Sequence, residues 1–243
     1  MPRYEDYTFR LQMYIECIAK YCKTDYEIII VEDINEKNIG FLRDFFTEQW
    51  LVGKKARIIE YWSYYDNPHG YNMIEAYAKN IGLMACKYPY VCITNCDILF
   101  NQAFFELCAS QLEPKTFYRF FEYETPAVQT WELESIENSF KDAVCLNKEL
   151  EFACKWSLKN IAFKSGDAML LDRESWLAIR GFPENEVWVH SDLIVCTVVN
   201  NNGFILKVEP DVKIYTYPQT RTLVERPFEL EKTYEYLNRK TCN

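Results

Sequence analysis

The sequence predicts an α/β protein with a Rossmann-like, mixed but mostly parallel central sheet that is flanked by helices. Segments with helical spacing alternate with short apolar runs through the first 112 residues. Such alternation is typical of parallel strands joined by right-handed crossovers. The runs at 26–33 and 90–94 are apolar almost throughout, as strands buried on both faces are. The length of 243 residues fits one domain of this kind.

In the first half, four helices are expected to alternate with three strands. Apolar residues recur at helical spacing in the segments 7–22, 38–50, 71–87 and 102–112. Strands are predicted at 26–33, 56–62 and 90–94. Ligands bind at the carboxyl ends of strands in such sheets. The polar residues at these strand ends are therefore candidate site residues: Glu32, Asp33, Asn95 and Asp97.

The second half is less regular. A strand is expected at 117–124, followed up to residue 160 by a mixed stretch, rich in Glu and Lys, that we interpret as an insertion covering the site. The later elements are a strand at 168–172, a helix at 173–182 closed by Gly181, a helix at 191–203, a strand at 204–210 and a polar helix at 226–240. We divide the single domain (1–243) into a first half, a second half and a helical tail: 1–112, 113–217 and 218–243.

Charge and cysteine usage narrow the class of protein. The net charge of -9 argues against a nucleic-acid partner. It allows a nucleotide ligand, because a divalent cation can lie between an acidic protein and a diphosphate. The ten cysteines form no CxxC pair, and several fall in periodic apolar segments. No signal peptide or apolar run of transmembrane length is apparent. We expect a reduced, cytoplasmic protein without a transmembrane segment.

Three separated motifs resemble those of GT-A fold glycosyltransferases, most similarly the inverting family 2 group. They are IIIVED at 28–33, AKNIGLMACKYPYVCITNCDILF at 78–100, and SGDAMLLDRESWLAIRGFPE with WVHSD at 165–184 and 188–192. The resemblance covers residues 7–215. It implies a nucleotide-diphosphate sugar donor, with a UDP-sugar favoured, a hydroxyl acceptor on a glycan, Mn²⁺ or Mg²⁺, and transfer with inversion.

On the donor side, the resemblance assigns the nucleotide base to Asp33, with Glu32 as the near alternative. A carboxylate suits a pyrimidine N–H because it only accepts hydrogen bonds. Both acids can instead cap the following loop. In the family's A-R-N-x-G segment, Lys79 replaces the usual Arg and Asn80 follows it. Lys79 is expected near phosphate; otherwise it is a solvated helix residue and Asn80 caps nearby backbone.

The family's D-x-D metal motif corresponds to Asn95-Cys96-Asp97. Asp97 aligns with the acid that bridges to the metal, which neutralises charge on the leaving diphosphate. Asn95 departs from the pattern; its role would be to accept from ribose hydroxyls or to ligate through oxygen. The alternative is that Asn95 and Asp97 only form an Asx turn.

The catalytic base of the family falls on Asp192, in the segment His190-Ser191-Asp192. An inverting transfer needs a carboxylate that takes the proton of the acceptor hydroxyl. The alternative is that Asp192 only caps a helix. His190 is expected to orient the acceptor, contact phosphate, join the metal or act as the base.

The resemblance assigns residues 1–112 to the nucleotide-sugar donor and 113–217 to the acceptor. On the acceptor side it implies that Gly166 allows close approach of a sugar and that Asp167 binds donor or acceptor hydroxyls. Trp188 stacks on a sugar face or packs in the core. Two departures from the family stand out. Only MPRYEDY precedes the first helix, where the family has a strand. Segment 214–221 has no histidine at the family's metal position, which leaves Tyr215 and Arg221 as candidate phosphate contacts.

Two other classes of protein are possible. The first is a nucleotidyltransferase that makes nucleotide-sugars. Such enzymes usually carry a Gly-rich phosphate loop, and the absence of G-x-G-x-x-G from this sequence argues against this class. The other class is a catalytically degenerate transferase kept as a sugar- or partner-binding module. Asn95 and the missing first strand favour it.

Overall fold

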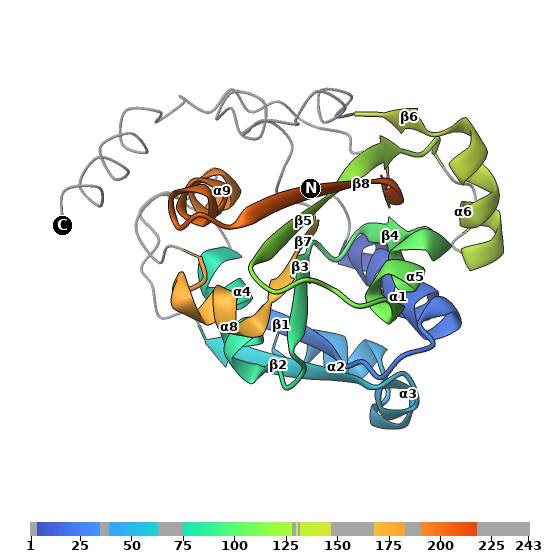
Figure 1. Cartoon of the computed structure of the whole chain (residues 1–243). Coiled ribbons are helices and arrows are strands. Elements are labelled where there is room, and N and C mark those ends of the chain that lie inside the picture. Colours follow the sequence, from blue (N-terminus) through green and yellow to red (C-terminus); the bar gives the residue numbers. More distant parts are fainter. Residues whose placement is uncertain are drawn as a thin grey trace, which may run out of the picture.

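The protein is a mixed α/β fold in which helices flank the sheets (Figure 1). The computed structural model describes residues 4–34, 39–62, 75–127, 130, 132–146, 168–182 and 191–217. Within these residues the strands form a parallel pair, β1 (Ile28–Ile34) with β2 (Ala56–Trp62), and a separate six-stranded sheet.

The first half follows the predicted order. Its helices and strands after β1 include α4 (Glu75–Ala85), β3 (Tyr90–Thr94) and α5 (Gln102–Ala109), and α1 (Tyr4–Tyr21) precedes β1. The helix expected at 38–50 is two short helices, α2 (Phe41–Phe45) and α3 (Glu48–Gly53). Thr47 explains the break, because its hydroxyl accepts the Trp50 N–H at 3.3 Å and so caps a new helix.

Two strands, β4 (Ile98–Phe100) in the first half and β6 (Val144–Cys145) in the second, were not revealed by periodicity. β4 follows Asp97 directly and pairs with the last strand, β8 (Ile205–Thr216). β8 continues six residues beyond the predicted end at 210, because after a register shift it pairs with β5 again. The remaining elements are β5 (Thr116–Glu124), α6 (Leu133–Ser139), the 3-10 helix η1 (Phe140–Asp142), β6 (Val144–Cys145), β7 (Ala168–Asp172), α8 (Arg173–Ala178) and α9 (Ser191–Asn201). The helix predicted at 226–240 lies outside the described residues.

The larger sheet has the strand order β3-β7-β5-β8-β4, with β6 on β5. Only β1–β2 and β5–β8 are parallel; β3–β7, β5–β7, β5–β6 and β4–β8 are antiparallel. The sheet is mixed, as expected, but the expectation that it is mostly parallel does not hold for these pairs. The alternation of helix and strand that supported it comes from the first half, whereas the antiparallel pairs all involve strands of the less regular second half or β4.

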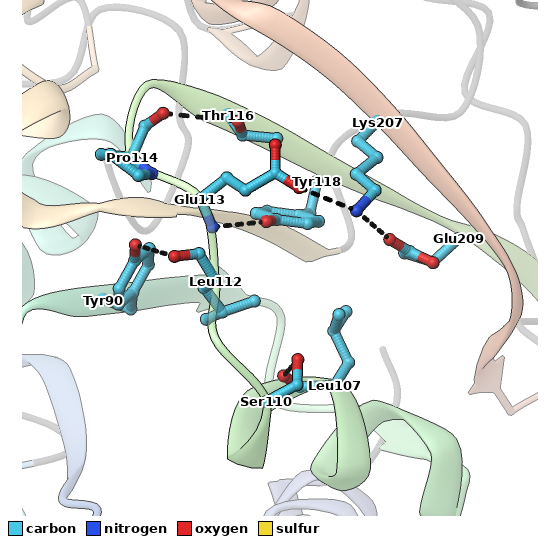
Figure 2. A network of polar contacts seen from close by, with 10 residues as sticks. All are labelled: Tyr90, Leu107, Ser110, Leu112, Glu113, Pro114, Thr116, Tyr118, Lys207 and Glu209. Atoms are coloured by element: carbon cyan, nitrogen blue, oxygen red, sulfur yellow. Dashed lines mark hydrogen bonds and ion pairs between the residues drawn. The ribbon is translucent and has the colours of Figure 1, made fainter.

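The core lies around β5, which is buried over most of its length. Polar contacts near one end of β5 link it to the start of β3 and to β8 (Figure 2). The Tyr90 hydroxyl at the start of β3 donates to the Leu112 carbonyl at 2.6 Å, and the Glu113 N–H donates to the Tyr118 hydroxyl at 2.8 Å. Nζ of Lys207 on β8 lies 3.2 Å from Oε1 of Glu113. The Tyr90–Leu112 bond is the one of these that holds β3, the strand whose other end leads to Asn95 and Asp97.

The described residues also show the state of the cysteines and the character of the helices. The cysteines of the described residues are free thiols, as expected. Among the helices that the structure describes, none is both long and apolar enough to cross a membrane.

Candidate functional site

Asp97 is a buried acid in the turn between β3 and β4. Its residue is 7% exposed, and its Oδ2 lies 3.5 Å from Nη1 of Arg10 on α1. The pairing offsets part of the cost of burying a charge. Asn95 is half-buried beside it, and the Thr94 hydroxyl donates to the Asn95 carbonyl at 3.0 Å. The turn therefore presents a carboxylate and an amide at the end of β3, as predicted.

Arg10 was missed by the sequence reasoning. Its guanidinium contacts Asp97 and lies 5.4 Å from the ring centroid of Tyr217, just after β8. Burial raises the pKa of the Tyr217 phenol far above its ordinary value, so that this hydroxyl stays protonated. A signal was present, because Arg10 precedes Tyr14 and Ile18 by four and eight residues and so falls on the apolar stripe of its helix.

Lys79 shares a cavity of about 740 Å³ with Asn95 and Asp97. Its side chain is only 9% exposed, is ion-paired with Glu75 one helical turn away, and lies 4.8 Å from the ring centroid of Phe182. The alternative of a solvated helix residue is therefore wrong. A cation and a carboxylate on one cavity suit a diphosphate that binds with a divalent metal.

Asn80 holds the turn that follows α8. Its Oδ1 accepts the Phe182 N–H at 2.8 Å, and its Nδ2 donates to the Phe182 carbonyl at 2.9 Å. Gly181 has φ +62°, and a Cβ at this position would collide with the Asn80 amide oxygen. Asn80 therefore caps backbone groups, as the alternative stated, although these belong to Phe182, which is distant in sequence. Its contact with a nucleotide stays a prediction.

Glu32 and Asp33 are both buried at the end of β1. They are adjacent in a strand and so point to opposite faces. Burial raises the pKa of the Tyr61 phenol, and the nearby Asp33 carboxylate makes a smaller contribution in the same direction. Burial raises the pKa of Glu32 to about 7. A hydrogen bond from the Leu42 backbone N–H acts in the opposite direction and lowers this pKa. The structure does not place either acid against the cavity that Asp97 and Lys79 line.

The predicted base, Asp192, is half-buried in the first turn of α9. An acid at this position stabilises a helix through its dipole, so the geometry fits the capping alternative and leaves catalysis as a prediction. Tyr215 packs in the core, its ring stacked on Phe140 with centroids 3.8 Å apart. The other predicted contacts lie outside the described residues: Gly166, Asp167, Trp188, His190 and Arg221.

The donor set at Asp97 fits a metal only together with a substrate. Among the described residues no three His, Cys, Asp or Glu side chains come together to hold an ion. Asp97 offers a carboxylate and Asn95 an amide, both with hard oxygen atoms. Mg²⁺ is commonly held by one or two carboxylates with substrate phosphates completing its shell. The two residues fit Mg²⁺ or Mn²⁺ in that mode, and they do not form a cage of their own.

Comparison with known proteins identifies the fold. The sequence matches no family profile and no curated protein. Solved structures do match, and the fold is that of GT-A glycosyltransferases. GalNAc-T7 with UDP, GalNAc and Mn²⁺ superposes with a TM-score of 0.60 at 11% identity over 91% of this chain and 43% of its own. The mannosyltransferase PcManGT from Pyrobaculum calidifontis, in complex with GDP-Man and Mn²⁺, gives 0.57 at 14% identity over 88% and 54%.

This chain therefore spans about half the length of these two structures. At such identities the likeness shows the fold alone. It supports the GT-A fold expected from the sequence and does not extend to the inverting family 2 group.

Proposed function

We propose that the chain is a glycosyltransferase that moves a sugar from a nucleotide-diphosphate sugar to a hydroxyl group of a glycan or other acceptor. A UDP-sugar is the favoured donor. The observation that carries the proposal is the position of Asp97, a buried carboxylate at the end of β3 that shares a cavity with Lys79 and Asn95. The fold of nucleotide-sugar enzymes supports it.

In this proposal the donor diphosphate lies between Lys79 and Asp97. Lys79 attracts the phosphate oxygens, and Asn95 accepts from ribose hydroxyls. Asp33, or Glu32 beside it, accepts from the base. Mn²⁺ or Mg²⁺ held by Asp97 would supply positive charge against the leaving diphosphate. Arg10 would balance Asp97 when no metal is bound, because its guanidinium lies 3.5 Å from that carboxylate.

The chemical step needs a base for the acceptor hydroxyl. We assign Asp192 to take this proton during a single displacement with inversion. Gly166, Asp167, Trp188 and His190 would form the acceptor side. If Asp192→Asn retains full turnover while His190→Gln loses it, the assignment moves to His190. The anomeric coupling of the product, measured by NMR, reports whether the transfer inverts.

Nucleotide binding tests the donor site directly. Thermal unfolding would be followed with UDP, GDP, CMP or dTDP, each with and without Mn²⁺. We expect UDP to stabilise the protein most, and more so with Mn²⁺. At a hundredfold excess over Kd, a ligand of the native state adds about 2.7 kcal/mol, which corresponds to roughly 5–10 °C in a protein of this size.

Asp97→Asn should remove the Mn²⁺-dependent part of this shift, because the amide keeps the shape of the carboxylate and loses its charge. Asp211→Asn is the matched control, since Asp211 is an exposed acid on β8. An Mn²⁺-dependent shift that persists in Asp97→Asn would contradict the metal assignment. If no nucleotide stabilises the wild type, the donor site itself is wrong.

A second candidate function is a sugar- or partner-binding module without turnover. The Arg10–Asp97 ion pair favours it, because the carboxylate already has a cationic partner. Asp97→Ala separates the two proposals. It abolishes sugar transfer in an enzyme and leaves partner binding intact in a module.

A further inference from the structure

Arg10 gives the carboxylate of Asp97 a cationic partner inside the protein. Nη1 of Arg10 lies 3.5 Å from Oδ2 of Asp97, and the two side chains are 17% and 9% exposed. Water screens charges poorly at such partly buried sites, so a guanidinium held there acts beyond its direct contacts. The charge of Arg10 therefore acts on any ionic ligand that binds at Asp97.

The packing of α1 holds Arg10 in place. Arg10, Tyr14 and Cys17 follow one another at helical spacing and so lie on one side of α1. The Cys17 thiol donates to the Phe100 carbonyl at 3.5 Å, and the centroids of the Tyr14 and Phe100 rings are 6.1 Å apart. Phe100 belongs to β4, which follows Asp97 directly and lies beside α1 (Figure 1). The contact of α1 with β4 therefore fixes Arg10 against the turn that carries Asp97.

Arg10 reaches Asp97 from outside the cavity. Asp97, Asn95 and Lys79 line this cavity, whereas Arg10 and Tyr217 do not. The guanidinium of Arg10 lies instead 5.4 Å from the centroid of the Tyr217 ring. A ligand in the cavity can therefore reach Asp97 while Arg10 keeps its position. Because Arg10 acts on such a ligand through Asp97 and through its charge, it is a positioning residue.

Lys79, on the other side of the candidate site, has a partner of a different kind. It pairs with Glu75 one turn away on α4, and the Glu75 side chain is 46% exposed. An exposed ion pair contributes little stability, so a phosphate group can replace Glu75 as the partner of Lys79. The Arg10 side chain is less exposed, and its helix packs on β4. Arg10 is therefore expected to stay beside Asp97 when a ligand binds.

A positive charge that stays beside Asp97 has opposite effects on the two components of a metal–nucleotide ligand. It offsets the negative charge that would attract a divalent cation to Asp97, and it repels that cation directly. The same charge attracts a diphosphate. Phosphate oxygens supply both negative charge and further ligands to a divalent cation. A cation should therefore bind weakly at Asp97 by itself and well when a diphosphate binds with it.

We propose that Arg10 is a fixed counter-ion that makes metal binding at Asp97 depend on the nucleotide. Asp97 then holds a free divalent cation weakly, and holds a cation that binds together with a nucleoside diphosphate well. This inference rests on the proposed donor site and adds a form of regulation to it. It gives Arg10, which lies outside the segment Asn95-Cys96-Asp97, a role in that site.

Two binding measurements on the full chain test the proposal. Binding of Mn²⁺ alone is followed by the electron paramagnetic resonance signal of the free ion, and binding of UDP alone by calorimetry in the presence of EDTA. In Arg10→Gln, which removes the charge, we expect Mn²⁺ to bind about fivefold tighter and UDP about fivefold weaker than in the wild type. A change of charge shifts the two affinities in opposite directions, whereas damage to the fold weakens both.

Two control variants accompany Arg10→Gln. Arg10→Lys keeps the charge and should leave both affinities close to the wild-type values. Lys23→Gln removes an exposed cation just beyond the other end of α1 and should change neither affinity. If Arg10→Gln does not fold with Asp97 present, the comparison is made in the Asp97→Asn background. Arg10→Gln should still weaken UDP binding about fivefold there.

The outcomes separate this inference from the proposed function. A wild-type protein that binds no UDP in the presence of Mn²⁺ would contradict the donor site, and the inference with it. If the wild type does bind UDP with Mn²⁺, three results would overturn the inference alone. They are equal affinities of the wild type and Arg10→Gln, weaker binding of both ligands by Arg10→Gln, and wild-type binding of Mn²⁺ that is as tight without UDP as with it.

Discussion

Glu32, in the donor half, has surroundings that oppose its charged form. Burial raises its pKa from 4.5 to about 7, and nearby Glu60 adds to the rise. Its Oε2 has no hydrogen-bond partner within the described residues. At neutral pH this carboxyl group is therefore close to half protonated. If it binds a nucleotide base as an acceptor, the affinity should rise as the pH increases through 7.

The raised pKa of Glu32 makes stability depend on pH. Between pH 4.5 and 7 the native state holds a proton that the unfolded state has lost, so stability falls as the pH rises through this range. Glu32→Gln removes the titrating group. We expect the variant to lose less stability than the wild type between pH 5 and pH 8, measured by urea unfolding. Glu106→Gln, at an exposed acid on α5, is the control. Equal losses in wild type and Glu32→Gln would show that Glu32 titrates normally.

At the scale of elements, the Asn80 clamp joins α4 to the turn after α8. It makes Gly181 a demanding position for two reasons. The backbone there has φ +62°, and a Cβ would meet the Asn80 oxygen that accepts the Phe182 N–H. A left-handed backbone costs a residue other than glycine about 1–2 kcal/mol. Disturbing the clamp adds about 1–3 kcal/mol.

Gly181→Ala should therefore destabilise the protein more than Gly203→Ala does. Gly203 is the matched control, because its φ is +71° and a Cβ added there would meet nothing within 4 Å. Urea unfolding measures both variants. In the Asn80→Ala background the extra cost at position 181 should shrink, since the colliding oxygen is gone. An equal loss of stability in Gly181→Ala and Gly203→Ala would mean that the Asn80 side chain moves aside without a measurable loss of stability.

The elements also show what the sequence could predict. Long periodic segments such as α1 and buried runs such as β3 were found within a few residues, because burial imposes a pattern on each of them. β4 has three residues and is too short to show a period. The break between α2 and α3 depends on the side-chain conformation of Thr47. Strand direction in the second half leaves no trace in periodicity, so the antiparallel pairs were missed.

In the candidate site, too, some residues were predicted from the sequence and others were missed. Asp97 was predicted from its position at the end of a strand and Lys79 from the resemblance to the family's A-R-N-x-G segment, and the structure brings them to one cavity. The partner of Asp97 is Arg10, and contacts so distant in sequence depend on how whole elements pack. The phosphate contact predicted for Tyr215 ignored its burial against Phe140.

At the scale of the whole molecule, α1 lies between two hydrophobic cores. Leu11 and Ile15 pack with β1, β2 and α3, whereas Met13 and Cys17 pack with β4 and α5. The two pairs are offset by two residues and so occupy opposite sides of the helix. Since β1 and β2 pair with no strand of the six-stranded sheet in the described residues, α1 is a main link between the two sheets.

This arrangement predicts two units of unequal stability. The β1–β2 pair has only one strand-to-strand ladder, so its amides should exchange faster than those of β5 and β8, which are paired within the larger sheet. Ile15→Ala and Met13→Ala each remove a fully buried side chain, at a cost of about 2–5 kcal/mol. Native-state hydrogen exchange should show Ile15→Ala lowering protection mainly in β1 and β2. Met13→Ala should lower it in the six-stranded sheet. If both variants lower protection equally everywhere, the two sheets unfold as one unit.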